Sequence, residues 1–97
     1  MNFQSFQYTL DMGHPPEDFN NLLKALWWDA KGNWKKAHEI VQSMNGKDAA
    51  WIHAYLHRKE GDLSNGSYWY DKAGQVMPED DLLSEFERIT SYILDVN

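Results

Sequence analysis

This chain of 97 residues contains no cysteine. Disulfide frameworks and cysteine-based zinc sites are therefore excluded, and nothing in the sequence argues for an oxidising compartment. The chain also lacks any apolar run approaching the roughly 18 residues that cross a bilayer, and no basic segment followed by an apolar one opens it. We therefore expect a soluble, cytoplasmic protein with no membrane partner.

Positive charge is scarce as well: nine Lys and Arg residues stand against fifteen Asp and Glu, giving a formal net charge of −6. An acidic chain repels phosphate backbones, so we expect no nucleic-acid partner. The basic runs, Lys35-Lys36 and Arg58-Lys59, are short and typical of a solvated helix face. Glycine-rich phosphate loops, nucleophile motifs and identifiable pairs of catalytic carboxylates are missing too. The sequence therefore favours a binding protein without a cofactor over an enzyme.

Hydrophobic residues make up 42% of the chain and aromatic residues 14%, which are values typical of globular proteins. A chain of this length forms one domain with a single modest core. Five Trp and five Tyr are many for such a chain. Some must be only partly buried, which favours a contact surface.

Apolar residues recur at helical spacing over about residues 17–31, 34–45, 48–60, 63–76 and 79–94. Gly32 and Gly61 mark very short connections, which place consecutive helices side by side in antiparallel pairs. Residues 1–16 show partly alternating apolar residues and end in two prolines, so they predict a short extended arm. The expected single domain thus has an arm, a first helix pair, a second helix pair and a capping helix, over residues 1–16, 17–46, 47–78 and 79–97.

Capping residues and glycines refine this prediction. Asn33 and Asp48 are suited to cap the second and third helices, and Gly61-Asp62 separates the third from the fourth. Gly66 and Gly74 fall inside the expected fourth helix, where glycine costs about 1 kcal/mol relative to alanine. We therefore expect tight helix contacts at both glycines.

An internal repeat is present. Placing Gly32-Asn33 over Gly61-Asp62 superposes two helix pairs about 29 residues apart. The second copy resembles the tetratricopeptide repeat, whose small and aromatic positions fall on Ala50, Ala54, Gly66, Tyr70, Ala73 and Pro78. The first copy matches less well: it keeps Trp28, Gly32, Ala37 and Val41 but lacks the terminal proline.

This resemblance covers about residues 18–80. It implies an all-α fold, a short right-handed array of antiparallel helix pairs with about two repeats and a C-terminal capping helix. It also implies a role in binding proteins or peptides. Residues 26–38 and 51–62 are in addition similar to a group of small uncharacterised microbial and fungal proteins, a resemblance that implies no activity.

The resemblance further implies a binding face. In a tetratricopeptide-like pair the first helix lines a concave groove, and the residues placed there are Trp51, Tyr55, Arg58, Leu22, Leu26 and Asp29. Trp, Tyr and Arg dominate binding hot spots because they bury much area and offer directed donors. The alternative is that Trp51 and Tyr55 are covered by the N-terminal arm or by a neighbouring helix. Because two repeats leave apolar side surface uncovered, a homodimer also remains open.

Histidines supply the competing hypothesis. His53 and His57 are four residues apart on one helix face, and His38 lies on the preceding helix. Three imidazoles around one ion would form a zinc site with an open position, and hence a small metal-dependent or acid–base enzyme. The H-E-x-x-H signature is absent, so no glutamate base is positioned between His53 and His57. Structural histidines, each with its own hydrogen-bond partner, and a pH-sensitive contact are the alternatives.

Overall fold

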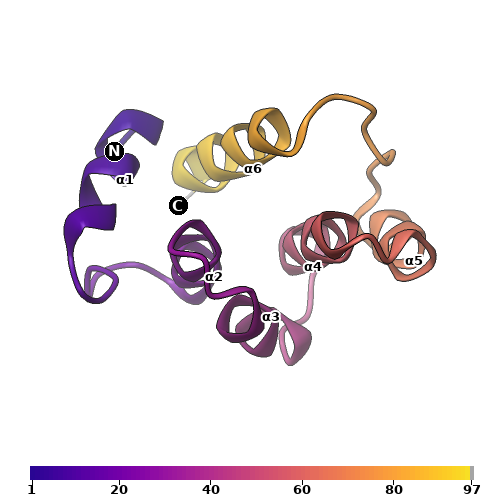
Figure 1. Ribbon diagram of the computed structural model, residues 1–97, viewed down its shortest axis with the longest axis horizontal. Helices are drawn as coiled ribbons and strands as arrows, with labels where there is room; N and C mark the ends of the chain where they lie inside the picture. Colours follow the sequence, from indigo (N-terminus) through magenta and orange to yellow (C-terminus); the bar gives the residue numbers. More distant parts are fainter. Residues whose placement is uncertain (97) are drawn as a thin grey trace.

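A computed structural model describes residues 1–96, and these residues are all helical apart from turns and connections. No strand occurs among them, so the predicted all-α class is confirmed. The elements in chain order are α1 Phe3–Tyr8, the 3₁₀ helix η1 Thr9–Asp11, α2 Asn21–Ala30, α3 Trp34–Gln42, α4 Lys47–Glu60, α5 Leu63–Ala73 and α6 Leu82–Val96 (Figure 1). No helix within residues 1–96 is long and apolar enough to cross a membrane.

The expectation of an extended N-terminal arm is wrong. Residues Phe3–Tyr8 form helix α1, which begins after Asn2, whose side chain accepts a hydrogen bond from the backbone of the first turn. Phe6 is fully buried and stacks on Phe19 with ring centroids 5.9 Å apart. Tyr8, two residues later, is exposed. In a strand, Phe6 and Tyr8 would lie on the same side. One is buried and the other exposed, so this segment follows the helical period instead.

Asparagine and aspartate side chains set where four of the longer helices begin, and the fourth is α6, where Asp81 accepts a hydrogen bond from the backbone N–H of Ser84. Asn33 caps α3 as predicted, and Asp62, at the expected start of the fourth helix, caps α5. Each accepts a hydrogen bond from a backbone N–H three residues later. Asn20 caps α2 in the same way, so this helix begins at residue 21 rather than 17. Asp48 does not cap α4: the helix begins one residue before it, after Gly46 with φ of 102°. Local capping chemistry thus explains where most, but not all, of these helices begin.

The two glycines expected inside the fourth helix differ from each other. Gly74 lies just past the end of α5 in the left-handed conformation, with φ of 71°, so the prediction that it lies within the helix is wrong. Gly66 does lie within α5 and against α4. A Cβ atom there would sit 3.7 Å from the backbone nitrogen of Arg58 and 3.8 Å from the carbonyl oxygen of Ala54. Gly66 thus lies in ordinary van der Waals contact with α4, and the one contact tighter than that is 3.3 Å to the side-chain end of Met77.

The helices pack around α4. The pairs α4–α5 and α2–α3 make the most extensive contacts, and α3 joins the two pairs by packing against α4. Helix α6 does not continue the row of helices beyond α5, where a capping helix was expected. It folds back across α2 and α4, with α1 beside it (Figure 1).

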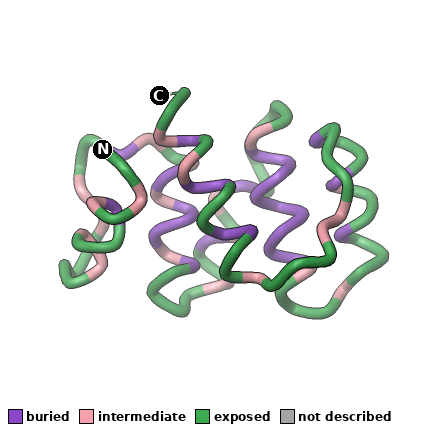
Figure 2. The backbone as a smooth tube through the Cα atoms, turned by 90° about the horizontal axis from the view of Figure 1, so that it is seen from above, coloured by how far each residue is buried: buried purple, intermediate pink, exposed green. Residues whose placement is uncertain are grey.

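Helix α4 contacts α2, α3, α5 and α6, and this central position explains its burial. All nine residues from Ala49 to His57 are buried, on every face of the helix. Figure 2 shows the buried stretches in the interior and the exposed ones at the turns. Side chains on opposite faces of α4 therefore face two different neighbours, α6 on one side and α3 on the other.

Candidate functional site

The predicted binding face does not form an open groove, because α6 lies on it. Trp51, Tyr55 and Leu26 are buried, and Leu22 is half-buried. The indole Nε1 of Trp51 donates to Oε2 of Glu85 on α6 at 3.1 Å. A neighbouring helix thus covers Trp51 and Tyr55, which was the alternative to an exposed face.

Glu85 is the residue that holds α6 there, and sequence reasoning missed it. Its carboxylate is fully buried and accepts hydrogen bonds from Arg58 at 2.9 Å and from the Tyr70 hydroxyl at 2.7 Å, besides that of the indole. Arg58 also donates to the backbone carbonyl of residue 80. An acid between Leu82 and Ile89, on the same face of an apolar stripe, was the signal available in the sequence.

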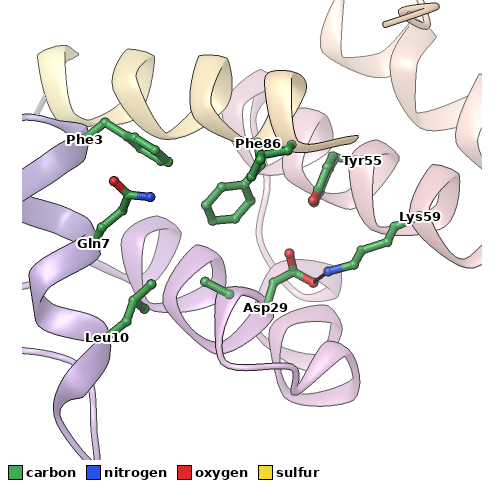
Figure 3. A pocket seen from close by; sticks show the side chains of 9 residues that line it. Phe3, Gln7, Leu10, Asp29, Tyr55, Lys59 and Phe86 are labelled. Atoms are coloured by element: carbon green, nitrogen blue, oxygen red, sulfur yellow. Dashed lines mark hydrogen bonds and ion pairs between the residues drawn. The ribbon is translucent and has the colours of Figure 1, made fainter. Parts of the chain in front are cut away.

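A pocket of about 360 Å³ remains where α1, α2, α4 and α6 meet (Figure 3). It contains two of the six predicted binding residues, Asp29 and Tyr55. Its other walls come from the N-terminal helix, the 3₁₀ turn and α6, and its lining residues are Phe3, Gln7, Leu10, Asp29, Ala30, Tyr55, Lys59, Leu83 and Phe86. The pocket is therefore largely apolar, with a small polar group on one side.

That polar group is organised by Asp29, which is 2% exposed. Its Oδ1 accepts a hydrogen bond from Nζ of Lys59 at 3.1 Å, while the buried Oδ2 makes no hydrogen bond of ordinary geometry within residues 1–96. The Tyr55 hydroxyl also interacts with this carboxylate as a donor. Burial raises the pKa of Asp29, and the Lys59 ammonium partly offsets this. The Tyr55 hydroxyl points toward the Asp29 carboxylate (Figure 3). Burial, and then the negative charge of Asp29, raise the pKa of Tyr55, so its hydroxyl stays protonated.

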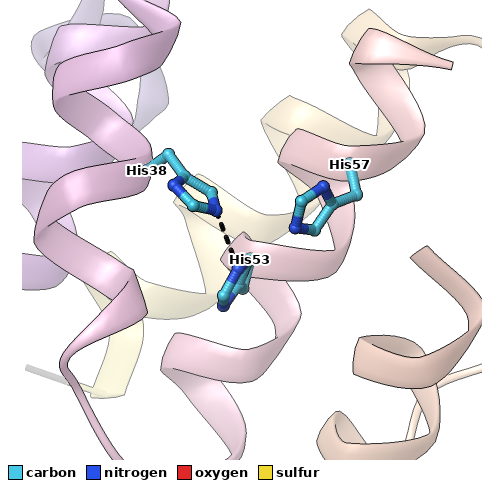
Figure 4. Close-up of side chains that lie close together, drawn as sticks. All are labelled: His38, His53 and His57. Atoms are coloured by element: carbon cyan, nitrogen blue, oxygen red, sulfur yellow. Dashed lines mark hydrogen bonds between the residues drawn. The ribbon is translucent and has the colours of Figure 1, made fainter. Parts of the chain in front are cut away.

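On the opposite side of α4, the structure brings His38, His53 and His57 together (Figure 4). Nε2 of His38 and Nε2 of His53 are 3.0 Å apart, so one imidazole N–H donates to the other nitrogen. The His57 ring lies 5.2 Å from the His38 ring and 4.9 Å from the His53 ring, measured between centroids. The fourth histidine, His14, is exposed and bonds locally to the carbonyl of Pro15.

Aromatic rings hold two of these imidazoles. Trp34 stacks on His38 with centroids 4.8 Å apart and planes at 9°, and Trp69 stacks on His53 at 4.1 Å and 18°. The Trp34 indole also donates to the backbone carbonyl of Leu56 at 2.7 Å, which ties α3 to α4. The third ring is held differently, by a 2.7 Å contact between Nδ1 of His57 and a carboxylate oxygen of Glu60.

The environment keeps at least two of the rings neutral. Burial, together with the neighbouring His38 and His57, lowers the pKa of His53 to about 4. Burial also lowers the pKa of His38, with His57 contributing. Neutral imidazole has a free lone pair, which is the form that ligates metals.

Two sites thus lie on opposite sides of α4: an apolar pocket with a buried carboxylate, and a cluster of three imidazoles. Comparison with protein-family models, with curated proteins and with solved structures found no match to this chain. We therefore infer function from the geometry of these two sites.

Proposed function

We propose that this chain is a cytoplasmic peptide-binding module, built as a short tetratricopeptide-like array, which receives a basic side chain of its partner in the Asp29 pocket. In this proposal α2–α3 and α4–α5 are antiparallel pairs stacked in a right-handed array. The short turns at Gly32 and Gly61 and the contact of α3 with α4 support this arrangement. So does Gly66, which meets α4 closely at a position where the resembled family carries a small residue.

Helix α6 limits where a partner binds. It occupies the face of α2 and α4 on which the resemblance places a bound peptide. The pocket beside α6, lined also by Phe3 and Leu10, remains accessible on this face. A partner segment therefore binds at the junction of α1, α2, α4 and α6, next to α6 rather than in its place.

The buried Asp29 carboxylate, whose Oδ2 makes no hydrogen bond of ordinary geometry and faces only the neutral Tyr55 hydroxyl among the described residues, is the observation that carries this proposal. Leaving a buried acceptor without a donor costs about 1–3 kcal/mol, and more for a charged group. The neutral Tyr55 hydroxyl satisfies Asp29 only weakly, so a partner that supplies a charged donor recovers part of this free energy. Lys59 neutralises the other oxygen from a partly exposed position, so its flexible side chain can move aside.

The surroundings favour a cationic donor. The rings of Phe3, Tyr55 and Phe86 line the pocket at different angles, with the Phe86 ring 6.2 Å from Phe3 and 5.9 Å from Tyr55. Aromatic faces beside a carboxylate attract Lys and Arg side chains. The net charge of −6 adds a long-range attraction for basic peptides.

Peptide display tests the proposal directly. A random peptide library is panned on the purified protein, and the enriched sequences are synthesised and titrated by fluorescence anisotropy. We expect enriched peptides to carry Lys or Arg, and Asp29→Asn to weaken their binding by about 10-fold or more, since a hydrogen bond to a charged group contributes about 1.5–3 kcal/mol.

Asp71→Asn is the matched control, because Asp71 is an exposed carboxylate on α5. This variant changes the net charge equally and should leave binding unchanged. The proposal fails if no basic peptide is enriched, or if Asp29→Asn binds as tightly as Asp71→Asn. Sedimentation of the free protein addresses the homodimer: a dimer lost in Asp29→Asn would make a second copy the occupant and overturn the peptide assignment.

A further inference from the structure

We propose that His38, His53 and His57 form a binding site for one divalent transition-metal ion, with zinc as the best fit. This site lies on the α3 side of α4 and shares no residue with the Asp29 pocket. The proposal therefore stands or fails independently of the peptide-binding function.

The distances between the three imidazoles suit a metal ion. Their ligand atoms all lie within 4.8 Å of one another, so some point lies within roughly 2.8 Å of all three. Zinc–nitrogen bonds are about 2.0–2.1 Å long, so a shift of under about 1 Å brings each ring into place. In a tetrahedral site two such nitrogens stand about 3.3 Å apart. The 3.0 Å between Nε2 of His38 and Nε2 of His53 is already close to that separation, and the N–H proton between them moves to Nδ1 of its own ring when both nitrogens bind the ion.

The rings are also oriented before any ion arrives. Glu60 engages Nδ1 of His57, which leaves Nε2 of that ring for a ligand bond. A carboxylate on the far nitrogen of a ligating histidine is the usual support in zinc sites, because it fixes the ring and raises its basicity. Trp34 and Trp69 hold the other two rings by stacking. Three rings held by three separate partners make a preorganised donor set.

The donor set indicates which metals bind. Three imidazole nitrogens select zinc, copper, nickel or iron over calcium and magnesium, which require oxygen ligands. Three protein ligands leave a fourth position for water or a small molecule. His38 is only half-buried, so the cluster is not sealed within the core.

A neighbouring group of one histidine and two carboxylates is less suited to bind a metal ion. His57, Glu60 and Asp62 also lie within 4.8 Å of one another through their ligand atoms. However, both carboxylate oxygens of Asp62 accept hydrogen bonds from Asn65, and Asp62 caps α5. Glu60 therefore acts through His57, as a positioning residue, rather than as part of a second site.

The first experiment titrates the whole chain, stripped with a chelator, with Zn²⁺ or Co²⁺. We expect one ion per chain in native mass spectrometry and by calorimetry, and visible Co²⁺ absorption typical of tetrahedral nitrogen ligation. Zn²⁺ at 100 times its Kd should raise the melting temperature by about 10–20 °C, because it binds only the folded chain. Absence of stoichiometric binding overturns the proposal.

Variants then locate the ion. His38→Gln and His57→Gln should abolish the visible Co²⁺ spectrum, and Glu60→Gln should weaken binding about 10–100-fold while leaving the spectrum tetrahedral. His14→Gln, which removes a histidine outside the cluster, is the matched control and should bind as the parent chain does. Far-UV circular dichroism checks that each variant is folded. Binding that survives both cluster variants, or that is lost in His14→Gln, places the ion elsewhere and overturns the proposal.

Discussion

At the scale of single residues, burial decides whether the central histidine is charged. The pKa of His53 falls from 6.5 to about 4 because α4 buries its ring and two other imidazoles adjoin it. The unfolded chain therefore takes up this proton near pH 6.5, whereas the folded chain takes it up only near pH 4. The contribution to stability is complete above pH 6.5 and is lost progressively as the pH falls toward 4. A shift of this size corresponds to on the order of 3 kcal/mol.

Urea denaturation between pH 7.5 and pH 4.5, in the presence of a chelator, measures this effect. His53→Phe removes the titrating group but keeps a ring to stack on Trp69, so its free energy of unfolding should fall less steeply with decreasing pH. His14→Gln should follow the parent chain, because His14 is exposed. Parallel profiles for His53→Phe and the parent chain would show that His53 carries no such linkage.

At the scale of the helical elements, two glycines with different roles allow a sharp comparison. Gly61 ends α4 with φ of 87°, a conformation that costs other residues about 1–2 kcal/mol. Gly66 has ordinary helical geometry, and a Cβ there would press only on the flexible end of Met77, at 3.3 Å. Alanine at Gly66 gains helix propensity of about 1 kcal/mol, which offsets that contact.

We therefore expect Gly61→Ala to lower the free energy of unfolding by about 1–2 kcal/mol and Gly66→Ala to leave it nearly unchanged. Gly66→Leu, which must also displace the backbone of α4 near Arg58, should cost about 1–3 kcal/mol. Chemical denaturation of the three variants ranks them by their free energy of unfolding. If Gly66→Ala proves more costly than Gly61→Ala, the packing of α5 on α4 is tighter than these contacts indicate.

Elements governed by local chemistry were predictable from the sequence, and elements governed by distant partners were not. Asn33 caps α3 as expected, and α5 begins at Asp62 as expected, because a cap needs only the next three residues. The α6 stripe was recognised as a helix, but its place across α2 and α4 depends on Arg58, which is far away in sequence. At the N-terminus, Phe6 is held by Phe19, and alternation over so few residues could not distinguish a strand from a short helix.

The same contrast between local and distant determinants applies to the two candidate sites. The spacing of His53 and His57 fixes their shared face, because both lie on one helix. The approach of His38 depends on how α3 packs against α4, which no local pattern specifies. Asp29 and Tyr55 were placed on the binding face by the resemblance to a tetratricopeptide-like pair, but α1 and α6 supply the pocket walls that give them a role.

At the scale of the whole molecule, one buried carboxylate connects three helices. Glu85 on α6 receives hydrogen bonds from Trp51 and Arg58 on α4 and from Tyr70 on α5. Removing one partner of a buried ion pair typically costs about 3–5 kcal/mol, because the remaining charge is left uncompensated. Since a small domain has a total stability of about 5–15 kcal/mol, this network is a large part of what keeps α6 in place.

Glu85→Ala should therefore lower the free energy of unfolding by about 3–5 kcal/mol, as measured by urea denaturation. Glu85→Gln, which retains the volume and one acceptor oxygen, should cost less, and Glu87→Ala, an exposed acid on the same helix, should cost under about 0.5 kcal/mol. Tryptophan emission adds a structural readout, because detachment of α6 exposes the Trp51 indole to water. A red shift in Glu85→Ala before global unfolding would mean that α6 leaves the face of α2 and α4 as a unit. Equal stability of the Glu85 and Glu87 variants would instead mean that the apolar stripe alone holds α6, with the buried carboxylate contributing nothing net.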